Sequence, residues 1–136
     1  MGAVLLTDAV GQAMQPGDHG TTFGGGPFVA HVANHVFDRV SDPALLAHVK
    51  AMEALMCELL AGVQRRSSKV RAVRGRGLMW GVDVTEPAKD VVARGLEAGL
   101  LLVSAGEHTI RLLPPLVIGK EALMQGMGML ERAISE

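Results

Sequence analysis

The sequence has few aromatic side chains and almost no cysteine. Tyrosine is absent, aromatic residues make up 3% of the 136 residues, and Cys57 is the one cysteine. A single cysteine excludes an internal disulfide, so we expect a protein of the reducing cytoplasm. Cys57 has no base placed near it by any motif, and we expect it to be a small core residue rather than a nucleophile. With so few rings, the core must be filled by aliphatic residues and by the eight methionines.

Charge excess and long apolar runs are also missing. The 13 basic and 14 acidic residues nearly cancel, which removes the electrostatic argument for nucleic acid or an anionic membrane as a partner. No apolar run approaches the roughly 18 residues of a membrane span, and the N-terminal residues lack the pattern of a secretory leader. We therefore expect no nucleic-acid and no membrane partner. A chain of this length can bury one domain-sized core.

The most distinctive segment is a polar, glycine-rich loop, Gly-Asp-His-Gly-Thr-Thr-Phe-Gly-Gly-Gly-Pro, at residues 17–27. Thr21 and Thr22 supply hydroxyl donors, and the glycines that follow expose backbone N–H groups just before a predicted helix. This is the chemistry that holds a phosphate near a helix N-terminus. Loops of this composition also serve as plain hinges, so both interpretations are open from the residues alone.

The hydrophobic periodicity predicts an alternation of helices and strands. The first part of the chain predicts a buried strand at 3–6, a short helix with Val10 and Met14 inward, and helices at 27–40 and 43–61. After a polar break at 62–69, the pattern predicts strands at 70–74 and 78–84, a helix from 85 to 98 with Leu96 inward, strands at 100–104 and 109–113, and a helix at 120–135. This order favours a small α+β domain of helices packed on a mostly antiparallel sheet.

The predicted strand at 3–6 has few partners within the chain. A buried strand needs neighbours on both sides, so residues 1–41 look like part of something larger, whereas 42–136 form a compact C-terminal domain.

Three motifs occur in one order along the chain: the loop from His19 to Pro27, Arg-Gly-Arg-Gly-Leu-Met at 74–79, and Arg-Leu-Leu-Pro-Pro-Leu at 111–116. Together they resemble the class III (ornithine-type) pyridoxal-phosphate aminotransferases, closest to the acetylornithine and ornithine branch. The resemblance implies an α/β architecture, the C-terminal part of a fold type I pyridoxal-phosphate-dependent transferase. Residues 1–41 would then be a remnant of the large cofactor-binding domain, with the phosphate loop and a linking helix, and 42–136 the C-terminal small domain.

The resemblance also assigns roles to three residues. Thr22 matches the threonine that reaches across a homodimer interface to the cofactor phosphate of the neighbouring subunit, with Thr21 beside it. Arg111 matches the arginine that binds the substrate carboxylate, a role that suits a planar guanidinium. Without the resemblance, Arg111 would read as an exposed strand residue between Ile110 and Leu112. Gly26 departs from the family, which usually has asparagine there.

The lysine that such an enzyme needs for its Schiff base is not recognisable in the chain. Lys50, Lys69, Lys89 and Lys120 all fall at positions typical of solvated charge. The resemblance places the catalytic lysine, and the aspartate that binds the pyridine nitrogen, upstream of Met1. We therefore predict no catalytic residue in this chain. It would be an inactive fragment of an enzyme that transfers an amino group from acetylornithine or a related amine to 2-oxoglutarate.

Other interpretations stay open. The chain could be a non-catalytic dimerisation or interaction fragment that uses the surface around Thr22 and the helix at 27–40, or an unrelated small phosphate-binding module. The Arg-Gly-Arg-Gly run is a poor RNA motif, because it occurs once and no aromatic residues interleave with it. His31 and His35 share a helix face but lack the glutamate of a zinc-protease helix, so we predict no metal site.

Overall fold

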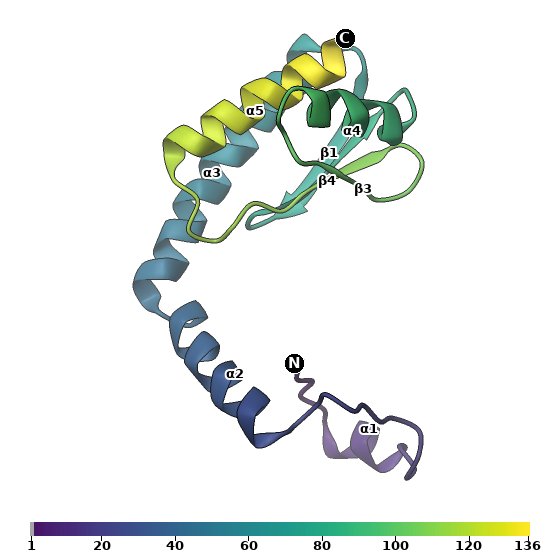
Figure 1. The fold of residues 1–136 in the computed structure, drawn as a ribbon, viewed down its shortest axis with the longest axis vertical. Helices are drawn as coiled ribbons and strands as arrows, with labels where there is room; N and C mark the ends of the chain where they lie inside the picture. The colour runs from purple at the N-terminus through teal and green to yellow at the C-terminus, as the bar shows by residue number, and fades with distance from the viewer. Residues whose placement is uncertain (1) are drawn as a thin grey trace. The chain divides into compact units, whose positions relative to one another are not determined.

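The structure is a computed structural model that describes residues 2–136. The chain divides into two compact units, Met1–Asp42 and Pro43–Glu136. Figure 1 shows the helices and strands of both units.

The first unit contains two helices and the glycine-rich loop between them. Helix α1 spans Asp8–Gln12 and helix α2 spans Pro27–Val40. Pro27 occupies the first turn of α2, where its missing N–H leaves no hydrogen bond unmade and its fixed φ suits the helix. The predicted bounds of this helix are therefore confirmed.

The strand predicted at 3–6 is wrong. Residues 2–7 have no regular structure, and the side chain of Leu5 is 99% exposed. Val10 and Met14, predicted to face inward, are exposed as well. The physical reason is that a strand needs a hydrogen-bonded neighbour, and the strands of the described chain all belong to one sheet in the second unit. The apolar pattern at 3–6 therefore has nothing to pair with here.

The second unit is a four-stranded antiparallel sheet with three helices. Its elements are α3 (Pro43–Arg66), β1 (Val70–Arg76), β2 (Met79–Val84), α4 (Ala88–Glu97), β3 (Val103–Ser104), β4 (Thr109–Leu112) and α5 (Lys120–Ser135). The strand order is β1-β2-β4-β3, and every neighbouring pair is antiparallel. The predicted layer of helices over an antiparallel sheet is confirmed.

One face of the sheet carries the core. Along β2, Trp80, Val82 and Val84 point to this face and are buried against the helices, as the period-two alternation predicted. Helices α3, α4 and α5, which are labelled in Figure 1, all contribute residues to the same hydrophobic cluster. The predicted inward face of α5 is confirmed, with Leu123, Met127, Leu130 and Ile134 all buried. The opposite face of the sheet is not covered by these helices.

Helix α3 is longer than predicted. It continues through Gly62 to Arg66, so the predicted polar break at 62–69 begins too early. Val63 is buried in the core, and Arg66 forms a two-pronged ion pair with Glu131 of α5, with Nε–Oε1 and Nη2–Oε2 distances of 2.6 and 2.8 Å. Tertiary contacts of this kind outweigh the low helix propensity of one glycine.

Cys57 and Leu96, which were predicted to be inward, are exposed as well. Cys57 follows the buried Met56, and Leu96 follows the buried Gly95. Each residue of a helix is rotated by about 100° from the one before it, so the neighbour of a core-facing residue is turned toward solvent. The strand bounds shift too, because β1 extends to Arg76 and β3 is limited to Val103–Ser104.

Gly75 lets the Trp80 side chain lie against β1. A Cβ at Gly75 would lie 2.4 Å from the Met79 carbonyl oxygen and 2.5 Å from the indole Cδ2 of Trp80. We therefore expect Gly75→Ala to lower the free energy of unfolding by about 1–3 kcal/mol, the usual range for overpacking. Urea denaturation followed by tryptophan fluorescence measures the change.

Gly128→Ala is the matched control. The nearest atom that its Cβ would meet is a terminal nitrogen of Arg132 at 3.9 Å, and the residue lies within α5. Alanine there should be neutral or stabilise by about 0.4–1 kcal/mol. Equal effects of the two substitutions would contradict the packing argument.

Candidate functional site

Thr21 and Thr22 lie in an exposed loop just before α2. The backbone N–H of Phe23 donates to Thr21 Oγ1 at 3.3 Å, so the Thr21 hydroxyl already helps to shape the turn. Gly25 has a φ of 81°, which favours glycine. The Thr22 side chain is exposed with no partner among residues 2–136, and it is the hydroxyl most available to a ligand.

The loop offers donors without any positive charge. Gly26 caps α2 without a side-chain hydrogen bond, which leaves the N–H groups of the first helical turn available to an anion. Residues 2–38 contain no lysine or arginine, and Arg39 is the first basic side chain after the histidines of this segment. A phosphate could be held here by hydroxyl and N–H groups, but the cation that compensates its charge would have to come from elsewhere.

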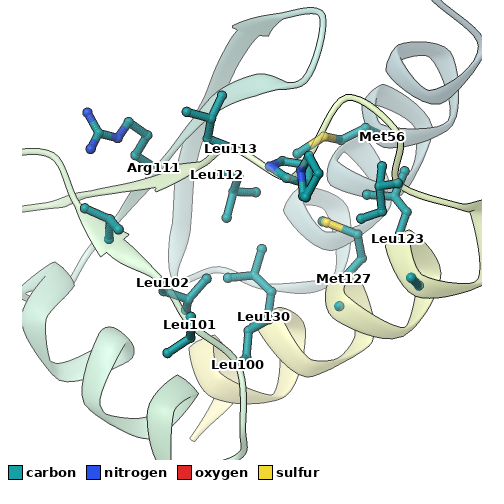
Figure 2. Close-up of a pocket in the computed structure, with 16 residues that line it drawn as sticks. Met56, Leu100, Leu101, Leu102, Arg111, Leu112, Leu113, Leu123, Met127 and Leu130 are labelled. Atoms are coloured by element: carbon teal, nitrogen blue, oxygen red, sulfur yellow. The ribbon is translucent and has the colours of Figure 1, made fainter. Parts of the chain in front are cut away.

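Arg111 lies at the centre of β4, on the open face of the sheet. It stands opposite Gly81 of β2, and Gly81 in turn stands opposite Arg74 of β1. Figure 2 shows the Arg111 side chain extending away from the leucine and methionine side chains of a neighbouring apolar cavity. This cavity of about 560 Å³ lies between α5, the Leu100–Val103 segment, the end of β4 and the loop after it, and Arg111 is one of the residues that line it.

A second, shallow depression of about 500 Å³ lies on the open face itself. Arg74, Arg76 and Arg111 line it, and Gly81, which lies between Arg74 and Arg111, adds no side chain to it. The side chains of Arg76 and Arg111 form no ion pair or hydrogen bond with any other residue between 2 and 136. Arg111 therefore presents an uncompensated guanidinium, which is suited to a carboxylate ligand.

Asp83 of β2 lies close to this depression, and its carboxylate already has hydrogen-bond partners. Its carboxyl group pairs with the guanidinium of Arg74, and the Thr109 hydroxyl donates to Oδ1 at 2.6 Å. These hydrogen bonds, first from Arg74 and then from Thr109, hold the pKa of Asp83 below its ordinary value. The sequence motif contained Arg74 but gave no sign of this network, because its members come from three strands.

The sequence contains four lysines, Lys50, Lys69, Lys89 and Lys120. All of them lie in the second unit, and Lys50, Lys89 and Lys120 are exposed. Lys69 is half-buried rather than fully solvated as predicted, because its Nζ donates to the Ser135 carbonyl at 3.2 Å and lies 3.5 Å from Glu86 Oε1. The same Glu86 oxygen pairs with Arg94 at 2.8 Å, so this cluster ties the end of α5 to the rest of the domain.

Metal-ligating side chains do not gather in groups of three or more anywhere in the part of the chain that the structure describes. His31 and His35 are exposed on α2. Across residues 2–136, none of the helices is long and apolar enough to cross a membrane.

Comparison with known proteins agrees with this fold and with these motifs. The family model "Aminotransferase class-III" matches residues 1–134. The chain belongs to the class III aminotransferases, and its architecture is part of a fold type I pyridoxal-phosphate-dependent aminotransferase.

The most similar relatives include mitochondrial acetylornithine aminotransferase of Eremothecium gossypii, which is 37% identical over 100% of this chain and 32% of its own length. Acetylornithine/succinyldiaminopimelate aminotransferase of Photorhabdus laumondii is 39% identical over 98% of this chain and 34% of its own length. The chain thus spans about a third of the length of the curated relatives it matches.

Solved structures give the same result. Acetylornithine aminotransferase of Elizabethkingia anophelis superposes with a TM-score of 0.80 at 29% identity, over 96% of this chain and 36% of that one. Ornithine delta-aminotransferase of Plasmodium falciparum superposes with a TM-score of 0.83 at 28% identity, over 96% of this chain and 35% of that one.

The engaged carboxylates predict acid sensitivity. Hydrogen bonds from Arg74 lower the pKa of Asp83, and those from Arg66 lower the pKa of Glu131. A folded-state pKa below the unfolded value stabilises the fold above the unfolded pKa, and this stabilisation is lost as pH falls through the folded pKa. We expect the urea concentration at the unfolding midpoint to decrease when the pH is lowered below about 4, the ordinary carboxyl range. Asp83→Asn should remove part of this pH dependence.

Glu58→Gln, at an exposed carboxylate on α3 without an ion pair in the described chain, should leave the profile unchanged. A pH profile identical in wild type and Asp83→Asn would contradict this assignment.

Proposed function

We propose that this chain is the C-terminal portion of an aminotransferase that moves an amino group from acetylornithine or a related amine to 2-oxoglutarate. The observation that carries the proposal is the unpaired guanidinium of Arg111, on an open sheet face and followed by the Pro114-Pro115 pair of the family motif. The names of the curated relatives support the acetylornithine branch. The substrates are accordingly small amino acids and 2-oxo acids.

Arg111 would bind a substrate carboxylate. Two parallel N–H···O hydrogen bonds from one guanidinium fix both the position and the orientation of a carboxylate. The neighbouring Gly81 leaves room above β2 for such a ligand. Arg111 would thereby orient the substrate while the rest of the active site acts on its amino group.

The cofactor would be pyridoxal phosphate, held at a shared site that this chain completes only in part. The Thr22 hydroxyl, the N–H groups at the start of α2 and the turn shaped by Thr21 fit a phosphate. The absence of lysine and arginine from residues 2–38 fits a site whose positive charge comes from another part of the enzyme or from a second subunit. Bound pyridoxal phosphate supplies the electron sink for amino-group transfer.

Residues 1–41 are proposed to be a remnant of the large cofactor-binding domain, and 42–136 the small domain. Support comes from the exposed apolar side chains of the first unit, which include Leu5, Phe28 and Phe37. Apolar surface of this extent suits burial against further protein, including the partner of a homodimer. We also propose a cytoplasmic location, because a single cysteine excludes an internal disulfide.

We expect no transaminase activity from this chain by itself. None of its lysines is placed beside the phosphate loop by sequence, and Lys69 is engaged with Ser135 and Glu86. The test combines acetylornithine, 2-oxoglutarate and pyridoxal phosphate with the purified chain, and measures glutamate formation. Borohydride reduction followed by mass spectrometry checks for a covalent cofactor adduct. Turnover, or an adduct on one defined lysine, would contradict the proposal.

The phosphate loop can be tested by titration. We expect pyridoxal phosphate and inorganic phosphate to bind weakly, and Thr22→Val to reduce their affinity about fivefold, the effect of one hydrogen bond of roughly 1 kcal/mol. Thr85→Val, at an exposed threonine of the second unit, is the matched control. A clear preference for nucleotides would favour the alternative of an unrelated phosphate-binding module.

The second candidate function is a non-catalytic dimerisation fragment. The specific observation in its favour is the exposed apolar stripe of α2, which includes Val32, Val36 and Phe37. Size-exclusion chromatography with light scattering separates it from a strict monomer.

A further inference from the structure

Two arginines compete for one carboxylate on the open face of the sheet. The cross-strand register places Arg74, Gly81 and Arg111 in one row, with Asp83 two residues beyond Gly81 on the same face of β2. Asp83 is therefore a diagonal neighbour of Arg74 on one side and of Arg111 on the other. Diagonal neighbours lie about 7–8 Å apart, which long side chains can span.

In the structure, Arg74 forms an ion pair with Asp83. Its Nη1 pairs with Asp83 Oδ2, and its Nη2 lies 3.4 Å from Thr109 Oγ1. The Thr109 hydroxyl donates in turn to the second carboxylate oxygen, Oδ1, at 2.6 Å. Both oxygens of Asp83 are thus used, and little remains for a second guanidinium.

Arg111 stays without a partner as a result. Gly81 has no side chain of its own between Arg111 and Asp83, and the Asp83 oxygen that Thr109 leaves unused is the one paired with Arg74. If Arg74 were removed, the released carboxylate would lie within reach of Arg111. The Asp83 carboxylate would then compete with a carboxylate ligand for the Arg111 guanidinium.

We propose that Arg74 is a positioning residue that keeps the Arg111 guanidinium free for a carboxylate ligand by occupying Asp83. This inference rests on the proposed role of Arg111 as a carboxylate-binding residue. It assigns to the first arginine of the Arg-Gly-Arg-Gly motif a role in ligand binding, exerted through Asp83 rather than by contact with the ligand.

The test uses the purified chain, with 2-oxoglutarate as the carboxylate probe and the arginine Nε–Hε resonances as the readout. Wild type and Arg111→Gln first define the binding that depends on Arg111. Arg74→Gln should then weaken this binding about threefold to fivefold, the size of an exposed ion pair. It should also shift the Arg111 resonance before any ligand is added.

Removing the Asp83 carboxylate should reverse the loss of binding caused by Arg74→Gln. In Arg74→Gln combined with Asp83→Asn, we expect affinity and the ligand-free Arg111 resonance to return close to wild type. Arg74→Gln combined with Glu58→Gln restores the same net charge but leaves Asp83 in place, so it should not recover. Arg65→Gln, at an exposed arginine of α3, controls for the loss of one positive charge. Arg74→Lys keeps a cation beside Asp83 and should retain most of the binding.

The outcomes separate the two claims. If Arg111→Gln leaves wild-type binding unchanged, the proposed role of Arg111 fails, and the inference fails with it. If Arg111 matters but Arg74→Gln has no effect, only the inference is overturned. If Arg74→Gln weakens binding and the added Asp83→Asn substitution does not restore it, the role of Arg74 is purely structural and the inference is overturned. Thermal unfolding of each variant identifies any loss of fold. If Arg74→Gln does not fold, Arg74→Lys decides between a structural role of Arg74 and its proposed role as the ion-pair partner of Asp83.

Discussion

The second unit depends on a sheet that is packed on one face and open on the other. Because successive side chains of a strand point to opposite faces, burying Trp80, Val82 and Val84 against the helices necessarily turns Gly81 and Asp83 outward. The same alternation buries Ile110 and Leu112 and turns Arg111 outward. The core and the candidate site are therefore two consequences of one strand register. A slip of one residue in β4 would bury the guanidinium and expose the core side chains.

The ion pairs on the open face of the sheet leave the guanidinium of Arg111 without a carboxylate partner among the described residues. Asp83 is satisfied by Arg74 and Thr109, and Arg66 is satisfied by Glu131 on the other side of the domain. The glycine-rich loop at 17–27 of the first unit offers hydrogen-bond donors and contains no lysine or arginine. In the proposed function, each half would contribute part of the binding of a phosphate-bearing cofactor and a carboxylate substrate, and neither half would supply the lysine. The chain spans about a third of the length of its curated relatives.

Much of the fold was predictable from the residues. The bounds of α2 and α5 and the inward positions of β2 follow from local signals, namely Pro27 at a helix start and regular apolar spacing. Failures occurred where the outcome depends on partners. The run at 3–6 is apolar enough for a strand but has no neighbour, and α3 passes through Gly62 because Val63 and Arg66 find contacts on other elements. Cys57 was misplaced because its neighbour Met56 takes the core position.

By itself, the sequence determined the family, the identity of Thr21, Thr22 and Arg111 as candidates, and the antiparallel sheet under a layer of helices. These rest on motifs and on periodicity, which are local properties of the chain. Only the tertiary structure decided which arginine is free. Arg74 and Arg111 are 37 positions apart in the sequence, and both lie diagonal to Asp83 because strand pairing places Gly81 between them. Which of them holds the carboxylate depends on distances and hydrogen bonds among three strands, and no pattern along one strand contains that information.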